Sequence, residues 1–546
     1  MAQVFPQPTE LERDICRRHD IPLPVAPAAE RLRSLFAFRS GHYLWPTRCE
    51  RTGKRILSAT PPSKGYKIYD VDAWLADDWD AKDFGRPYDF TRPFFEQFSD
   101  LLSVVPISNV SGGHASLENS GYCNFVSAAK NCYLIFSGSS IEDCLYGRFL
   151  YRSRNLIDCF YARDCELCYS CRDIEQSYGL SFSSGCSACS ESTFLENCRS
   201  CRNCYCCSNL VRKEFYWMNE PLSPSEWHAR RNAVDLGNRD VLNREKARAR
   251  EFFISQPTRA IYGTHSEGST GNYLHQTKDC FESYLISESE LIDHCVWMNN
   301  AKSCAFVVGF GNGSELLYNS VGVGNSAFQV FFSAQCRGSV RDLEYCFLTE
   351  AGSHDCFGCV SVRRSQFCIL NKQYSESEYR ELLSRVKAHM RSTGEYGRFF
   401  PNRLAPSPYN QSDAAFAFPL DRESAEGLGF GWGDEPSTNA ASSAVAPNHI
   451  ALADHTVLDQ VFQCTATKRG YKFQRKELEF LQSARIALPS ESPFERIRQS
   501  ASFLLWKPTA LISCAGCGEN CTSVFDPKLR PILCEGCYQG LLVDGA

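Results

Sequence analysis

The sequence predicts a mainly β protein: a duplicated parallel β-helix (solenoid) flanked by small ribbon-like domains, with short capping helices. Three observations predict this fold class. Cysteines recur at a fixed spacing in the middle of the chain, a second segment repeats the end of the first at a fixed shift, and the two ends of the chain align with each other. No helical periodicity appears in the middle region, so short strands are expected there.

The cysteines between positions 123 and 207 recur with a period of about 27 residues, which indicates one structural repeat of that length. Short runs of β-forming residues alternate with Gly, Ser, Asn and Asp, which fits a coil of three short strands. Equivalent residues of successive coils should then stack about 4.8 Å apart. Two columns are predicted: Cys132, Cys159 and Cys186, and Cys144, Cys171 and Cys198.

Asn or Asp repeatedly stands directly before a cysteine in this region. These side chains tolerate turn geometry and bond nearby backbone groups, so we interpret the pair as a corner followed by an inward thiol. The residues concerned are Asn131, Asp143, Asp158, Asp164, Asn197 and Asn203.

One stretch of the same region can also be interpreted as a metal-binding site. Cys198, Cys201, Cys204 and Cys207 form a CxxCxxCxxC run, which can resemble the ligand set of an iron–sulfur cluster. The run lacks the proline that follows the bacterial ferredoxin pattern, and the periodicity explains part of its spacing. Packing and cluster binding both remain open at this point.

The end of the cysteine-rich region is repeated later in the chain at a constant shift. Phe215 falls on Phe367 and Asn219 on Asn371. Each copy then begins a helix with a Ser followed three positions later by Glu, which is a capping box. The pairs are Ser223 with Glu226 and Ser375 with Glu378, each followed by an aromatic residue, Trp227 or Tyr379. We expect these helices to cover the exposed strand edges of two separate solenoids.

The C-terminal cysteines have the spacing of a zinc ribbon. Cys514 and Cys517 form one CxxC pair, and Cys534 and Cys537 form a second pair after a spacer of about sixteen residues. Four thiolates on two knuckles suit tetrahedral Zn²⁺, which favours sulfur ligands. The sequence therefore predicts one structural zinc ion held by these four residues.

The N-terminus aligns with this ribbon without a gap. Cys49 falls on Cys514, whereas Thr52, Tyr69 and Asp72 stand where the other three ligands would be. One thiol and one carboxylate do not make a structural zinc site. We predict a ribbon-like domain that holds no metal.

The predicted domains follow from these patterns. They are 1–75, a degenerate, metal-free ribbon-like domain; 76–110, a connector; 111–222, solenoid copy 1; 223–259, a helix; 260–374, solenoid copy 2; 375–392, a helix; 393–455, an extended segment and flexible linker; and 456–546, the zinc-ribbon domain.

Composition narrows the function classes. The 546 residues include 30 cysteines, carry a formal charge of −5, and show neither a signal-peptide pattern nor an apolar run that could cross a membrane. We therefore expect a cytoplasmic protein with reduced thiols, no membrane association, and no strongly basic surface overall. The first predicted helix is nevertheless rich in arginine, which leaves a nucleic-acid partner open.

Several long motifs in order resemble a known family. They are CERTGK (49–54), WDAKDFGRPYDFTRPFFEQF (79–98), KNCYLIF (130–136), the segment 203–227, GEYGRFFP (394–401) and CAGCGENCTSVFDPKLRPILCEGCYQ from Cys514. Together the chain resembles an uncharacterised family of cysteine-rich proteins with a probable zinc-ribbon domain, found mostly in uncultivated bacteria. The resemblance implies zinc at the four C-terminal cysteines and no particular activity. The chain departs from the family at Cys464 and Thr467, where a second CxxC is expected, and near the N-terminus, where cysteines are missing.

The leading functional hypothesis is a non-enzymatic zinc-binding scaffold with a protein partner. A nucleic-acid- or ribosome-associated protein is the second hypothesis, and a β-helix carbohydrate-acting enzyme is the third. The enzyme would need carboxylates on one face, for which Asp143, Asp158 and Asp173 are the candidates. Iron–sulfur or redox chemistry is the fourth. No catalytic residues are predicted, and the sequence does not define an oligomeric state.

Overall fold

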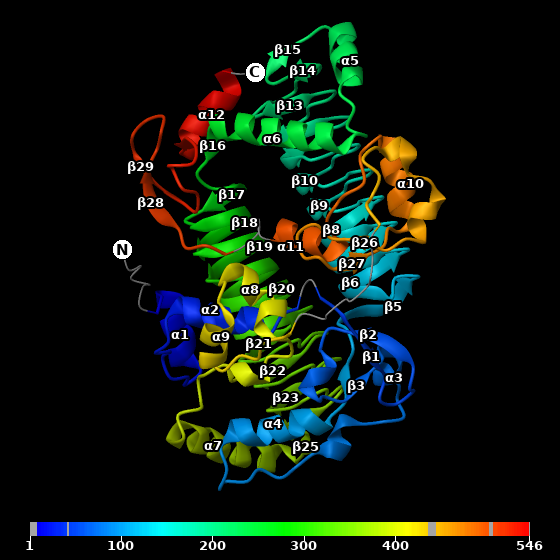
Figure 1. The fold of residues 1–546 in the computed structure, drawn as a ribbon. Helices are drawn as coiled ribbons and strands as arrows, with labels where there is room; N and C mark the ends of the chain where they lie inside the picture. Colours follow the sequence, from blue (N-terminus) through cyan, green and yellow to red (C-terminus); the bar gives the residue numbers. More distant parts are fainter. Residues whose placement is uncertain (1–7, 41–42, 435–443, 502–505, 545–546) are drawn as a thin grey trace.

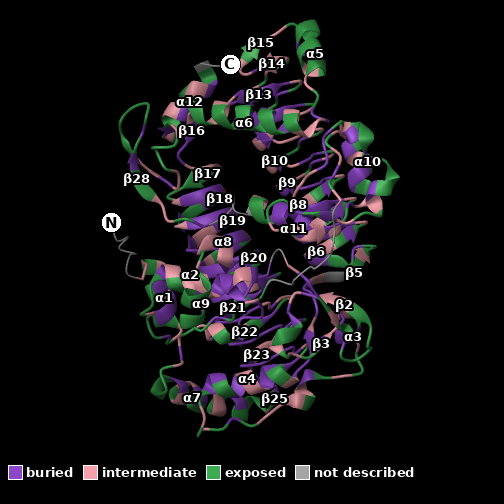
Figure 2. Cartoon of the chain, in the orientation of Figure 1, coloured by how far each residue is buried: buried purple, intermediate pink, exposed green. Residues whose placement is uncertain are grey.

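The computed structural model describes residues 8–40, 43–434, 444–501 and 506–544 (Figure 1). The protein is mostly β, with 34% of the chain in strands and 26% in helices. Two large sheets dominate it, and each is built from strands that pair in chain order. Figure 2 shows that most strand residues are buried and that the exposed residues gather on the outer helices and loops.

The first sheet has eleven strands, parallel except for the last pair. The strands are β5 (Gly112–Glu118), β6 (Tyr122–Lys130), β7 (Tyr133–Glu142), β8 (Leu145–Arg154), β9 (Phe160–Arg163), β10 (Arg172–Glu175), β11 (Ser184–Ser187), β12 (Thr193–Glu196), β13 (Tyr205–Ser208), β14 (Tyr216–Trp217) and β15 (Glu220–Pro221).

The register of this sheet contradicts the predicted coil length. Phe160 lies opposite Arg172, and Tyr205 lies opposite Trp217. Vertical neighbours are 12 residues apart, as are Asn131 and Asp143, whose side chains bond each other. The interval within each predicted cysteine column is not a whole number of such repeats. The predicted coil length is therefore wrong, and the two predicted cysteine columns do not exist.

A three-residue unit underlies this repeat. The buried side chains inside the first sheet fall at every third position, including all the cysteines from Cys123 to Cys207 except Cys206. The residue before each of them often has a positive φ, for example 52° at Asn131 and 55° at Asp143. Asn and Asp adopt this left-handed conformation more readily than other non-glycine residues. The predicted corner role of these residues is thus confirmed.

The second sheet has nine strands, again parallel except for the last pair. Its repeat is 11 residues in the first pair, where Gly263 lies opposite Leu274, and then 12; it rises to 13 between Glu315 and His354 and returns to 12 in the last parallel pair. The strands are β17 (Gly263–Glu267), β18 (Gly271–Phe281), β19 (Ser283–Asp293), β20 (Val296–Gly324), β21 (Phe328–Phe331), β22 (Arg341–Glu344), β23 (His354–Phe357), β24 (Gln366–Ile369) and β25 (Lys372–Gln373).

Both sheets end with the same asparagine contact. The residues that form it in the two sheets are equivalent positions of the sequence repeat. The side-chain amide of Asn219 donates to and accepts from the backbone of Ser208, and Asn371 does the same with Val360. The helices α5 (Pro224–Ala233) and α7 (Glu376–Ser392) follow, and each begins with the predicted capping box.

The buried aromatic residue of each capping helix packs on the last rung of its sheet. The ring centroids of Trp227 and Phe215 lie 6.1 Å apart, and those of Tyr379 and Phe367 lie 5.7 Å apart. Of the strand pairs that the structure describes, none joins the first sheet to the second. The expectation that strand pairing would not run continuously from one to the other is confirmed.

The helix predicted at 223–259 is two helices. α5 ends at Ala233, and α6 (Arg239–Ser255) begins after a turn in which the Asp235 carboxylate accepts from the Gly237 amide. Asn238 then caps α6, because its side chain accepts from the amides of Asp240 and Val241. In Figure 1, α6 crosses between the upper ends of the two sheets.

The sheets lie side by side. The rings of Phe149 in the first sheet and Trp297 in the second are 5.2 Å apart, and Ser111 Oγ donates to Gln335 Oε1 at 2.8 Å. Arg39 lies between them, with its guanidinium 4.4 Å from the ring of Phe125 and 5.2 Å from that of Trp297.

The two ends of the chain contain the same elements in the same order. The first two helices and the two hairpin strands begin at equivalent positions of the gap-free alignment, and the strand and helix that follow begin one residue later in the N-terminal set. The N-terminal set is α1 (Glu10–Arg18), α2 (Ala28–Ala37), β1 (Trp45–Arg48), β2 (Arg55–Ser58), β3 (Ile68–Tyr69) and α3 (Val71–Leu75); the C-terminal set is α10 (Arg475–Ala484), α11 (Pro493–Ala501), β28 (Ala510–Ser513), β29 (Asn520–Ser523), β30 (Ile532–Leu533) and α12 (Glu535–Asp544).

Each helix pair packs on the sheet that is more distant in sequence. In the N-terminal pair, Arg31 bonds Glu12, whose carboxylate also accepts from Tyr318 of the second sheet at 2.8 Å. In the C-terminal pair, Arg496 bonds Glu477 at 2.7 Å, and Glu477 accepts from Tyr146 of the first sheet at 2.9 Å.

The last strand of each end unit pairs with a strand that leads into the other sheet, not into the sheet on which the helices of that unit pack. β3 pairs with β4 (Ile107–Ser108), which leads into the first sheet, and β30 pairs with β16 (Thr258–Arg259), which leads into the second. Each end unit therefore contacts both sheets.

Two predicted segments are more ordered than expected. The connector 76–110 contains α4 (Phe94–Val104), whose Phe94 packs on Tyr345 and Phe357 of the second sheet. The segment predicted as extended from 393 contains α8 (Ala414–Ala417) and α9 (Arg422–Gly427) and buries Tyr409. Residues 435–443 of the predicted linker lie outside the described part of the chain.

Candidate metal centre

Four cysteine side chains meet in the C-terminal unit formed by β28, β29, β30 and α12, the segment predicted as a zinc ribbon. The Sγ atoms of Cys514, Cys517, Cys534 and Cys537 all lie within 4.8 Å of one another. Among the described residues, no other group of three or more His, Cys, Asp or Glu side chains is this close. These are the four ligands that the sequence predicts, and the group can hold a metal ion.

Two turns hold the ligands in place. Cys514 follows β28, and its backbone bonds both Glu519 and Gly518 in a tight turn where Gly518 has a φ of 78°. Cys534 directly precedes α12, and its carbonyl accepts from the amide of Tyr538 at 2.9 Å. The first pair therefore sits on a hairpin turn and the second pair on the first turn of a helix.

Backbone amides point at the first sulfur. The amide of Cys534 donates to Cys514 Sγ at 3.2 Å and that of Gly516 at 3.3 Å. The amides of Cys534 and Cys517 lower the pKa of the Cys514 thiol to about 6. Donors of this kind favour the thiolate, which is the form that binds a metal.

One sulfur–sulfur distance matches the value expected around a tetrahedral ion. Zinc–sulfur bonds of about 2.3 Å in a tetrahedron place the sulfurs about 3.8 Å apart. The Sγ atoms of Cys517 and Cys534 are 3.8 Å apart. Glycine is required beside them, because a Cβ on Gly516 would lie only 2.9 Å from Cys537 Sγ.

The N-terminal ribbon has the same turn around one cysteine. Cys49 bonds Lys54 and Gly53 through its backbone, as Cys514 bonds Glu519 and Gly518. Its Sγ accepts from the amides of Thr52 and Asp70. The amide of Asp70, which caps α3, contacts Cys49 as the amide of Cys534 contacts Cys514. Asp70 is therefore the structural equivalent of Cys534, although the gap-free alignment pairs Cys534 with Tyr69. The offset arises because the N-terminal turn is one residue longer.

A third copy of the turn surrounds Cys464, which sequence reasoning noted only as an incomplete CxxC. It follows the first strand of the hairpin β26 (Phe462–Gln463) and β27 (Gly470–Tyr471), and its backbone bonds Lys468 and Arg469. Thr467 stands where Cys517 stands in the metal group. The C-x-x-T spacing shared with Cys49 and Thr52 is the signal that could have revealed it.

The four cysteines considered for an iron–sulfur cluster do not form a comparable group. Cys198, Cys201, Cys204 and Cys207 are buried, and each thiol donates to the carbonyl two positions before it. All 30 cysteines are free thiols, and all are buried except Cys517, Cys521, Cys534 and Cys537. The accessible thiols therefore gather in the ribbon.

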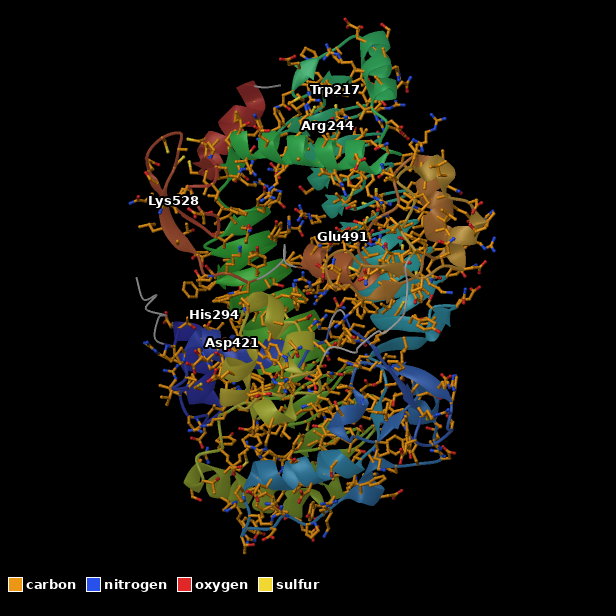
Figure 3. The ribbon with its side chains drawn as sticks, in the orientation of Figure 1. Trp217, Arg244, His294, Asp421, Glu491 and Lys528 are labelled. Carbon is orange, nitrogen blue, oxygen red and sulfur yellow. The ribbon has the colours of Figure 1, made fainter. Side chains whose placement is uncertain are left out.

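Only part of the basic surface predicted on α5 and α6 is used inside the molecule, because Arg230, Lys246, Arg248 and Arg250 are exposed. Arg239 donates to the carbonyls of Ala446 and Pro447, and Lys246 lies 4.7 Å from the ring of Phe182. Arg244, labelled on α6 in Figure 3, remains exposed.

The three candidate carboxylates for a carbohydrate enzyme are not brought together. Asp143 pairs with Lys476, and Asp158 pairs with Arg496, so the C-terminal helices occupy both. Asp173 instead lines a cavity between the two sheets.

No helix in the described ranges is long and apolar enough to cross a bilayer. Comparison with protein-family models and with curated proteins gave no match. Among solved structures, a crystal structure of a "putative acetyltransferase" from Desulfovibrio desulfuricans G20 aligns over 51% of this chain and 81% of that chain, at 10% identity and a TM-score of 0.11. A similarity at this level supports no conclusion about fold or activity.

Proposed function

We propose that this protein is a zinc-binding scaffold in which a zinc ribbon fastens two parallel β-solenoids to each other. The solenoid interpretation is supported by the chain-order pairing, the register of 12 residues between most rungs and, in the first sheet, the buried side chain at every third position. The four converging thiols are the observation on which the proposal depends. Four sulfur ligands without an open position are typical of a structural rather than a catalytic ion.

The ribbon contacts both sheets, so an ion that holds the ribbon together also helps to hold the sheets together. Arg530 forms two bonds, of 3.2 and 2.9 Å, to the Glu196 carboxylate of the first sheet, and Tyr538 donates to Asn209 at 2.9 Å. On the other side, β30 pairs with β16, and Ser523 donates to Ala260. Because the ribbon's own apolar cluster is small, its fold should depend on the metal.

Metal analysis tests the proposal directly. Purified protein should contain about one zinc ion per chain and be colourless, whereas an iron–sulfur cluster would be brown. Cys534→Ser should abolish zinc binding. Cys521→Ser is the matched control, since Cys521 lies in the same ribbon but outside the group of four, and it should keep the metal.

Hydrogen exchange tests the fastening role. Loss of zinc should speed exchange at residues 258–260 and around Glu196, where the ribbon meets each sheet, and leave the far end of the second sheet at β24 unchanged. Iron in place of zinc, or unchanged exchange at both contacts after metal removal, would rule the proposal out.

A further inference from the structure

A cavity of about 200 Å³ lies between the two sheets. Its walls come from β8, β9 and β10 on one side and from β17, β18 and β19 on the other. Figure 1 shows these strands facing each other below α6. None of the residues in its walls belongs to the metal centre or to the docking contacts of the end helices.

The walls are ladders of polar side chains, one rung apart. In the first sheet, Tyr151, Arg163 and Glu175 occupy the same register in successive rungs. In the second, Thr264, His275 and Ser287 do so. Neighbouring rungs of a sheet lie about 4.8 Å apart, so each wall offers polar groups at a regular spacing.

The cavity continues into a second, open hollow of about 510 Å³ over β18, β19 and β20. Gln276 and Glu288 line both spaces. The larger hollow is lined by alternating cations, carboxylates and amides, including Lys278, Glu290 and Asn300. Its volume alone lies within the range of about 300–1,000 Å³ that small-molecule sites occupy.

The chemistry of the walls selects a ligand class. Asp173, Glu175 and Glu288 face one arginine, Arg163, in the cavity, so an anionic ligand such as a phosphate is disfavoured. The walls carry both hydrogen-bond donors and acceptors. Hydroxyl groups both donate and accept, so a ligand rich in hydroxyls can satisfy carboxylate, guanidinium and amide groups together.

Two side chains reinforce this selection. The ring of Tyr161 lines the cavity together with Asp173 and, with Tyr151, adds aromatic surface to the polar groups of the wall. Burial raises the pKa of Asp173 to about 7 and lowers that of His275 to about 4. His275 is therefore neutral at pH 7, and its Nδ1 lies 3.1 Å from Thr264 Oγ1.

We propose that the cavity between the sheets, together with the hollow that continues from it, binds an uncharged oligosaccharide. The terminal sugar would lie between Tyr161 and His275, and the following units would lie along β18 to β20. The site is a binding site, and no bond cleavage is assigned to it. This inference stands independently of the zinc ion.

An array of defined oligosaccharides, followed by calorimetry with the tightest one, tests the proposal. Asp173→Asn, Tyr161→Ala and Glu288→Gln should each weaken binding by about tenfold or more, or about 1.4 kcal/mol. Asp164→Asn is the matched control, because Asp164 is also a left-handed corner of the first sheet but pairs with Arg152 outside the cavity. It should bind like the unaltered protein.

Glu288 is exposed, so its variant tests the site even if a cavity variant folds poorly. Absence of binding to every neutral oligosaccharide would overturn the proposal. So would equal affinity for the unaltered protein and Glu288→Gln. Binding of spermine in the same calorimeter without saccharide binding would show that the carboxylates select a cation instead.

Discussion

Asp413 connects two buried arginines at the place where the sheets meet. Its carboxylate lies 2.5 Å from Arg148 and 3.4 Å from Arg39, and all three residues are at most 5% exposed. Burial lowers the pKa of Arg39 to about 10, so its positive charge remains at neutral pH. The two cations also pack against Trp297, whose ring face attracts positive charge.

Asp413→Asn should therefore destabilise the protein by about 3–5 kcal/mol, the usual cost of leaving a buried charge unpaired. Chemical denaturation measures the change. Asp164→Asn removes an exposed carboxylate that pairs with Arg152 and should cost less than about 1 kcal/mol. Equal losses in the two variants would contradict the buried-pair explanation.

Gly516 limits what the metal centre tolerates. Gly516→Ala should lower zinc affinity, because the new Cβ would push against Cys537 Sγ. Competition with a zinc chelator measures the affinity. Gly536→Ala is a suitable control within the same ribbon, since a Cβ there meets no atom within 4 Å.

Asp173 should give stability a recognisable pH dependence. Its pKa is raised by burial to about 7, whereas the unfolded value is near 3.8, so the folded state holds a proton that the unfolded state releases between these values. Its contribution to stability is therefore present below about pH 4 and is lost as the pH rises to 7. Asp173→Asn should show a smaller drop in unfolding free energy between pH 4.5 and 7 than the unaltered protein. An identical drop would contradict this assignment.

At the scale of elements, features that depend on a few neighbouring residues could be predicted from the sequence. The capping boxes at Ser223 and Ser375, the corner asparagines and the four ribbon cysteines each follow from a few neighbouring residues. The repeat length did not follow, because the interior positions also accept Leu, Ile and Ala. Cysteine therefore occupies only some of the interior positions. The spacing of about 27 residues between some of the cysteines is a consequence of this and is not the length of one coil.

Trp227 is the element-scale test of the caps. Trp227→Ala should destabilise the protein by about 3–5 kcal/mol, as truncation of a buried aromatic residue does, with zinc content unchanged. Arg230→Ala, on the exposed face of the same helix, should change stability little. Loss of zinc in the tryptophan variant would show that the cap and the ribbon are coupled.

For the molecule as a whole, the crossed packing of the end units could not be predicted from sequence. The sequence relates residues 1–75 to the C-terminus, but no pattern indicates that α1 and α2 pack on the second sheet or α10 and α11 on the first. Those contacts depend on Glu12 with Tyr318 and on Glu477 with Tyr146, which are 306 and 331 residues apart.

Hydrogen exchange in a pair of variants tests the crossing. Glu12→Ala should speed exchange in β20 of the second sheet, because it leaves the largely buried Arg31 without its carboxylate partner. Glu477→Ala should speed exchange in β8 of the first sheet, because it removes one of the two carboxylates that pair with the buried Arg496 and the acceptor of the Tyr146 hydroxyl. The opposite pattern, with each variant loosening the sheet nearest in sequence, would show that the crossed contacts carry little energy.

The crossed packing also constrains how the chain is made. A ribosome releases α1 and α2 first, yet Tyr318, the partner of Glu12, is synthesised 306 residues later. The first sheet is complete at Pro221 but receives its covering helices only when positions 475–501 emerge. Domains usually fold in order as they appear during synthesis. Here α1 and α2 must wait for the second sheet, and the first sheet must wait for α10 and α11, so the nascent protein is expected to need a chaperone until translation ends.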